Sequence, residues 1–199
     1  MLRYGLLAIA YASMAAIALG ISELFLDRSV WLHPAPWLGL RGPVAHAYSL
    51  ALGLALGAVV VVGTRRMVER LLWAQELARA LRPFARDLSG SGIIVVAILS
   101  SVGEELLFRG LVQPWLGIWL QALLFGLLHQ MPGPSRWPWV LWASVIGLVF
   151  GAVFAATGSL LGPIVAHAVI NGFNLNYLQN HPEVSRRGLG GLLGHRSRA

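Results

Sequence analysis

The stretch GEELLFRG, residues 103–110, places two adjacent glutamates and an arginine near the middle of the apolar segment 92–115. This segment is long enough to cross a bilayer as one helix. A charge at membrane depth costs at least ~2.5–3.5 kcal/mol on insertion scales, so it requires a partner or a function. Glu105 and Arg109 are four residues apart, with the acid first, and should meet on one helical face. Glu104 is rotated by about 100° from Glu105, which predicts one paired carboxylate and one that is free to act.

The composition indicates a membrane protein. Only 12% of the 199 residues are charged and 57% are hydrophobic, whereas a soluble domain has about 25% charged residues. We therefore expect an all-α, polytopic membrane helix bundle. The absence of cysteine excludes disulfides and thiolate chemistry. The net charge of +7 comes from arginines in loops and tails between apolar segments, which indicates membrane orientation and not nucleic-acid binding.

Apolar segments separated by breakers predict about six transmembrane helices. They lie at residues 6–25, 44–63, 92–112, 115–129, 137–156 and 160–178. Gln113-Pro114 is expected to break the third segment from a short fourth one. Three prolines mark residues 26–43 as a loop, and Thr157-Gly158-Ser159 reads as a tight turn.

Residues 64–87 have a different pattern. Apolar side chains recur there at spacings of three and four, interleaved with six arginines. This pattern is typical of a basic amphipathic helix that lies on an anionic membrane surface, although a solvated connector is the alternative. We expect Pro83 to end this helix.

The arginine distribution also predicts orientation. With six helices and an internal N-terminus, twelve arginines lie inside, two lie outside and Arg109 lies in the membrane. This bias places both termini in the cytoplasm, with the bacterial cytoplasmic membrane as the expected location. We divide the chain into an N-terminal membrane pair with the amphipathic helix (1–88), a core (89–180) and a basic flexible tail (181–199).

Polar side chains recur at membrane depth on three of the expected helices. Besides the glutamates these are His129, His167 and Asn171, and the last two share a helical face. One buried histidine is more often a satisfied hydrogen-bonding group than a ligand. The joint pattern of an acid pair, two histidines and an asparagine favours a site in a shared cavity, because such groups usually mark function.

Two kinds of hydrolytic chemistry fit this set, and the sequence leaves both open. In the first, Glu104 and His129 activate a water molecule while His167 and Asn171 stabilise the oxyanion. In the second, Glu104, His129 and His167 hold a zinc ion that keeps an open position for water. The sequence contains no HExxH helix of the common zinc-protease type, and no organic cofactor is expected.

Three motifs carry a resemblance to a known family. GEELLFRG resembles the EExxxR motif of the CAAX protease and bacteriocin-processing family of intramembrane proteases, which is related to the type II CAAX prenyl endopeptidase. Residues 125–129 resemble its FxxxH motif, and residues 167–171 its HxxxN motif. The resemblance covers roughly residues 89–178 and implies an α-helical membrane peptidase. It implies Glu104 as the catalytic acid/base, completed by His129, His167 and Asn171 and supported by Glu105, Arg109 and Phe125.

We therefore expect an endopeptidase that acts near a membrane-associated terminus of a peptide or protein, with the lipid bilayer as its other partner. The alternative is a non-catalytic immunity or scaffold protein of the same fold. A scaffold does not need costly polar groups inside the membrane, which disfavours it. A small proton-coupled transporter would commonly have repeated halves, and the sequence has no convincing internal repeat.

Overall fold

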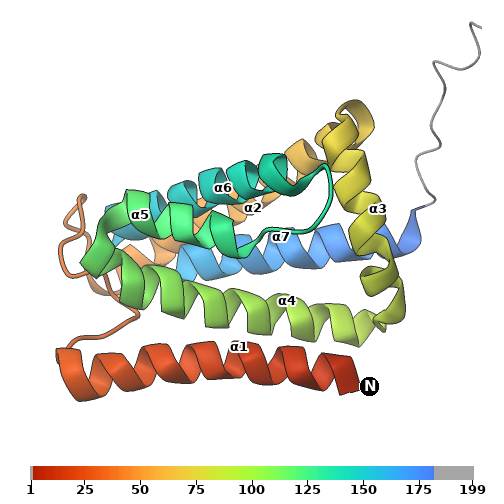
Figure 1. The fold of residues 1–199 in the computed structure, drawn as a ribbon. Helices are drawn as coiled ribbons and strands as arrows, with labels where there is room; N and C mark the ends of the chain where they lie inside the picture. The colour runs from red at the N-terminus through yellow and green to blue at the C-terminus, as the bar shows by residue number, and fades with distance from the viewer. Residues whose placement is uncertain (1, 182–199) are drawn as a thin grey trace, which may run out of the picture.

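The computed structural model describes residues 2–181, and these form a bundle of α-helices without a β-strand. The predicted all-α fold is confirmed (Figure 1). The predicted basic tail lies outside the described residues from position 182 onward. The helices are α1 (Leu2–Ile21), α2 (Gly42–Arg70), α3 (Leu72–Asp87), α4 (Gly90–Glu105), α5 (Gln113–Leu128), α6 (Arg136–Thr157) and α7 (Leu161–Asn180), with π-helical segments η1 (Ser22–Leu26) and η2 (Leu106–Val112).

Four helical segments are long and apolar enough to cross a membrane, which makes this an integral membrane protein. They are Gly5–Leu26, Gly42–Arg70, Gly90–Leu128 and Arg136–Thr157. Large apolar side chains such as Leu24, Val59 and Trp119 are exposed on the bundle surface, as lipid-facing residues are. The four spans differ from the six predicted transmembrane helices in two places. α5 shares the third span with α4, and α7 is not among the four because its sequence is interrupted by asparagines and a histidine.

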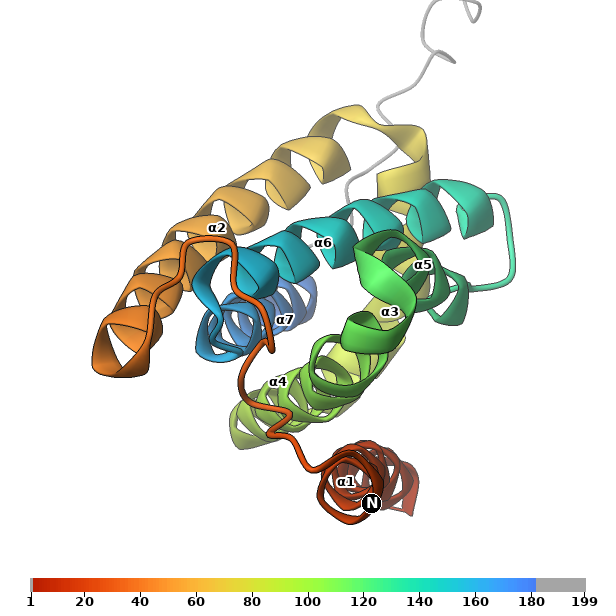
Figure 2. The same ribbon diagram turned by 90° about the vertical axis from the view of Figure 1, so that its left-hand side faces the viewer.

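α2 and α7 pack together through small residues. A Cβ atom added to Gly53 would lie 2.3 Å from the carbonyl oxygen of Gly162, so only glycine permits this approach. The Ser49 hydroxyl oxygen accepts a hydrogen bond from the Gly162 amide at 2.9 Å. In contrast, α1 lies at the edge of the bundle beside α4 (Figures 1 and 2). Ala18 of α1 is nevertheless fully buried, in a core cluster with Leu106, Phe154 and Leu160.

The chain turns back inside α5, at Gly117 and not at the predicted Gln113-Pro114 break. Pro114 lies in the first turn of α5, which follows η2 with helical φ and ψ at Val112 and Gln113, so the proline does not interrupt the span. Gly117 has φ +76° and ψ 170°, which is non-helical and favours glycine. After it, α5 runs back toward the end of the bundle that carries α3 (Figure 1). This return places His129, the C-cap of α5, opposite α4.

The predicted amphipathic helix is divided. Residues 64–70 continue α2, Leu71 is extended, and α3 begins at Leu72. The expectation that Pro83 ends the helix is wrong, because α3 continues to Asp87. Its last turn is held by the Gln179 side chain, which donates to the carbonyls of Ala85 and Leu88 at 3.1 and 2.5 Å.

The apolar face of α3 packs against the protein. Its buried residues include Ala74, Leu77 and Ala78, and α3 lies across one end of the bundle (Figure 1). Arg82 of the same helix is buried and donates to the His181 carbonyl at 2.6 Å. The helix expected to lie on the membrane surface therefore covers the end of the bundle and packs on α7.

Candidate active site

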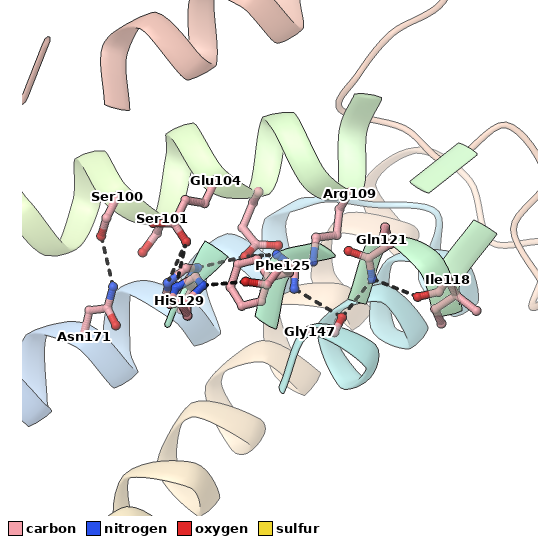
Figure 3. A network of polar contacts seen from close by, with 12 residues as sticks. Ser100, Ser101, Glu104, Arg109, Ile118, Gln121, Phe125, His129, Gly147 and Asn171 are labelled. Carbon is pink, nitrogen blue, oxygen red and sulfur yellow. Dashed lines mark hydrogen bonds and ion pairs between the residues drawn. The ribbon is translucent and has the colours of Figure 1, made fainter. Parts of the chain in front are cut away.

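The predicted ion pair is present and fully buried. Arg109 Nη1 lies 3.0 Å from Glu105 Oε1, and both side chains have 0% exposure. Arg109 Nη2 donates to the Gly147 carbonyl of α6 at 3.2 Å. The guanidinium carbon lies 4.2 Å from the ring centroid of Phe125, so the cation rests on an aromatic face (Figure 3). The pair thus links α4, η2, α5 and α6 at one point.

His167 is attached to the same carboxylate. Its Nδ1 lies 2.8 Å from Glu105 Oε1. Because that oxygen also accepts from Arg109, the carboxylate is the acceptor and Nδ1 carries the proton. A carboxylate in this position fixes both the tautomer and the orientation of an imidazole. Nε2 of His167 is therefore the atom that faces Glu104.

Glu104 does not contact Arg109, as predicted from its rotation relative to Glu105. Its Oε2 is buried and has no hydrogen-bond partner among the described residues. It lies 3.5 Å from Nε2 of His129 and 3.9 Å from Nε2 of His167. Nδ1 of His129 lies 2.7 Å from the Phe125 carbonyl, which can only accept, so this nitrogen carries the proton. One carboxylate oxygen and two imidazole nitrogens therefore converge without a proton donor between them when both rings are neutral.

Asn171 lies on the same side of α7 but does not contact these groups. Its Nδ2 donates to the Ser100 hydroxyl at 3.0 Å (Figure 3). Ser100 is itself 1% exposed and donates to the Ala97 carbonyl. Asn171 is thus held one helical turn from His167, with one of its two amide hydrogens bonded to Ser100.

Two buried glutamines extend the polar core, and the sequence analysis did not single them out. Gln121 is 0% exposed, and its Nε2 donates to the Gly147 carbonyl at 3.0 Å. Gln113 Nε2 donates to the Gly151 carbonyl at 2.9 Å. An uncharged amide inside an apolar helix is a weaker sequence signal than a charge, which explains the omission of both residues.

A cavity of about 220 Å³ lies beside the converging groups. Side chains from α2, α3, α5, α6 and α7 line it, and most of them are apolar or aromatic, including Trp73, Leu77, Trp139, Trp142 and Ile146. His129, His167 and Asn171 line the same cavity. The polar site therefore opens into an apolar space of the kind that typically holds a ligand.

Within residues 2–181, no group of three or more histidine, cysteine, aspartate and glutamate side chains is arranged to hold a metal ion. Glu104, His129 and His167 do approach one another, at 3.5 and 3.9 Å from the carboxylate oxygen to the two nitrogens. These are direct acid–imidazole contacts.

Glu104 and two histidines thus meet inside a membrane helix bundle, next to an apolar cavity. Residues 88–173 match the model of the family described as type II CAAX prenyl endopeptidase Rce1-like. The resemblance found in the motifs is thereby confirmed for this segment, which contains Glu104, His129, His167 and Asn171 and points to a protease in general.

The chain is also similar to an uncharacterized protein of Bacillus subtilis (strain 168), YpbD. The two are 34% identical over 79 residues, which is 40% of this chain and 41% of YpbD. The chain thus matches about two-fifths of the length of that relative. No solved structure matches the chain.

Proposed function

We propose that the chain is an intramembrane endopeptidase that hydrolyses a peptide bond near a membrane-associated terminus of a protein or peptide. The observation that carries the proposal is the buried, unpaired Glu104 Oε2, which faces Nε2 of His129 and of His167. Both histidines line an apolar cavity. An unpaired buried carboxylate oxygen is costly. A function that requires an accepting oxygen at this position accounts for it.

Glu104 acts as the general base. A water molecule next to Oε2 donates one hydrogen to the carboxylate and the other to one imidazole nitrogen, which satisfies two of the three converging acceptors. As the water oxygen attacks the peptide carbonyl carbon, its proton moves to Glu104. When the carbon–nitrogen bond breaks, Glu104 returns that proton to the leaving amine. General acid–base catalysis of this kind typically contributes 10²–10⁴-fold in rate.

The oxyanion needs donors, and α7 supplies candidates. Asn171 has a second amide hydrogen that is not bonded to Ser100. His167 can donate from Nε2 when both ring nitrogens carry a proton, and the Glu105 carboxylate at 2.8 Å from Nδ1 holds the ring in place. Two such donors aimed at the developing charge are the usual arrangement in acyl transfer.

Zinc held by Glu104, His129 and His167 remains the alternative prediction for how the water is activated. A bound zinc ion would act as a Lewis acid and lower the pKa of its water. Both versions use the same three side chains, so mutation of these residues does not separate them. Removal of metal does, as set out in the Discussion.

The function is tested with purified protein in liposomes and a library of membrane-associated peptides. Cleavage by the wild type and its loss in Glu104→Ala support the endopeptidase. Equal turnover from both proteins, or none from either, favours the non-catalytic scaffold. The exposed Glu69 of α2 has no ion pair among the described residues, so Glu69→Ala is the matched control and should cleave like the wild type.

A further inference from the structure

The active-site cavity contains one cation that the proposed mechanism does not use. Arg65, near the end of α2, lines the cavity together with Asn174 and Tyr177 of α7. The described residues that line this cavity include no aspartate or glutamate. Arg65 forms no ion pair with any residue of the described chain. Its positive charge therefore faces an apolar space without a counter-ion from the protein.

The contacts of Arg65 hold its side chain in place without using all of its donors. Nη2 donates to the Phe173 carbonyl at 3.1 Å, and the guanidinium carbon lies 4.2 Å above the ring of Tyr177. Nε is buried and has no hydrogen-bond partner among residues 2–181. A guanidinium carries five N–H donors in a fixed fork, so most of them remain available.

Asn174 lies next to this cation. Its side-chain oxygen lies 3.1 Å from the Thr64 hydroxyl, whose one hydrogen is shared with the Val60 and Val61 carbonyls at 2.9 and 3.0 Å. Its amide nitrogen has no acceptor among the described residues. The corner formed by Arg65, Thr64 and Asn174, here called the Arg65 corner, therefore presents N–H donors and a positive charge to the cavity.

The neighbouring arginines differ from Arg65. Arg66, the next residue, is exposed and does not line the cavity. Arg82 is bonded to the His181 carbonyl at 2.6 Å. A role in membrane orientation accounts for an exposed arginine such as Arg66, but it does not account for a guanidinium that faces a cavity shared with the catalytic groups.

We propose that the Arg65 corner binds a carboxylate of the peptide substrate and so determines which peptides enter the site. The proposal rests on the proposed peptidase function, because it assigns a binding role within the same cavity. Arg recognises a carboxylate through two parallel N–H···O bonds, which are among the stronger hydrogen bonds in proteins. In an apolar cavity such a pair gives selectivity as well as affinity, since a neutral peptide would leave the guanidinium unpaired.

The spacing along α7 fits one peptide that reaches both sites. The Arg65 contacts at Phe173 and Tyr177 lie six and ten residues after His167, which is roughly 9–15 Å along a helix at 1.5 Å per residue. An extended peptide advances about 3.3 Å per residue. About three or four residues of an extended chain would therefore connect a carbonyl at Glu104 with a carboxylate at Arg65.

The test measures binding without turnover. Full-length Glu104→Gln protein in liposomes is exposed to N-acylated octapeptides of random sequence that lack Asp and Glu. These are synthesised as free acids, as C-terminal amides, and as amides that end in aspartate. We expect the free acids to bind about 10–100-fold more tightly than the amides, the range for a charge-assisted pair. Binding of the amides that end in aspartate shows whether Arg65 recognises a side-chain carboxylate or only the carboxylate of the C-terminus.

In the same background, Arg65→Gln should bring the ratio of acid to amide affinity close to one, and Arg66→Gln should leave it unchanged. The ratio is taken within each variant, so a loss of folded protein does not affect it. A wild-type ratio near one, an equal effect of both variants, or no retention of any peptide would overturn the assignment. Selective binding through Arg65 without cleavage by the active chain would instead overturn the peptidase function alone.

Discussion

Two neighbouring regions of the molecule use the same residue type in opposite ways. On one side, Glu105 is fully buried, with its Oε1 bonded to Arg109 and to His167. On the other, Glu104 has a 10% exposed side chain and an Oε2 that lacks any hydrogen-bond partner in the described chain. The two glutamates are adjacent in sequence, and the helical rotation between them pairs Glu105 with Arg109 and turns Glu104 toward His129 and His167, which line the cavity.

The difference shows how a membrane helix can carry both structural and reactive charge. The Glu105 region ties four helical elements together and fixes the direction of His167. On the Glu104 side, the oriented imidazole of His167 faces the carboxylate and also lines the apolar cavity. The structural glutamate, Glu105, is thus adjacent in sequence to the proposed reactive glutamate, Glu104. Variants of Glu105 should therefore lower protein stability, whereas variants of Glu104 should lower activity.

The largest expected effect comes from the cavity side. Glu104→Gln keeps the size and the hydrogen-bonding capacity of the side chain but removes the base. Peptidase activity should fall by at least ~100-fold, the scale of general-base loss. The midpoint of thermal unfolding in detergent should not fall, because this oxygen has no partner to lose and its unpaired charge is itself costly. Retained activity would show that the reactive carboxylate has been assigned to the wrong region.

The next effect belongs to the core side and should appear in stability. Glu105→Gln leaves the guanidinium of Arg109, with 0% exposure, without its counter-charge. Breaking a buried ion pair typically costs about 3–5 kcal/mol, which should lower the folded yield and the midpoint of thermal unfolding. Arg109→Gln should have a similar effect for the reciprocal reason.

A double variant is the control for this prediction. Replacing both partners at once, as in Glu105→Leu with Arg109→Met, removes the uncompensated charge, and such replacements are often neutral or stabilising. The double variant should therefore fold better than either single variant. If Glu105→Gln alone folded normally, the pair would not have the structural role that its burial indicates.

Much of the fold follows from the sequence because apolar length and breakers fix membrane helices. The boundaries that were wrong depend on tertiary contacts. Pro83 is accommodated inside α3 because side chains of α7 hold the following turn. The real break lies at Gly117, where φ is positive. A sequence pattern cannot distinguish these cases, because it contains no information about which surface a helix packs on.

The candidate site divides in the same way. The Glu105–Arg109 pair was predictable because i,i+4 spacing determines contact within a helix. The bond between His167 and the same carboxylate joins residues 62 positions apart, and no local rule predicts it. The Ser100–Asn171 bond likewise depends on how α4 meets α7. The spacing of polar residues in the sequence therefore predicted which residues form the site, whereas the packing of the helices determines which of them are in contact.

A smaller effect is expected at the border between the two regions. Asn171→Ala removes a proposed oxyanion donor, and turnover should fall by about 10²-fold, the lower end for one such donor. Ser100→Ala removes the bond that orients Asn171 together with the local bond to the Ala97 carbonyl. Turnover should fall by at most about tenfold, because the one neutral hydrogen bond to Asn171 contributes about 0.5–1.5 kcal/mol. Equal losses in the two variants would indicate that this pair serves packing and not the oxyanion, and initial rates at saturating peptide would reveal it.

The smallest expected effect is that of metal removal. This experiment distinguishes water activation by the Glu104 base from water activation by a zinc ion. If Glu104 is the base, incubation with phenanthroline should leave the initial rate of the wild type unchanged, because no step depends on a metal. If instead Glu104, His129 and His167 hold zinc, chelation should abolish activity and added zinc should restore it. Activity would then also fall on acidification, since zinc-bound imidazoles must be deprotonated at the bonding nitrogen. Asn171→Ala should leave the metal content unchanged in that case, because the amide is not in the ligand set.

Elemental analysis of the active protein supplies the independent readout: about one zinc per chain, lost together with activity, would replace the glutamate base by a metal centre. The assignment of the Glu105–Arg109 region as structural support would remain as it is.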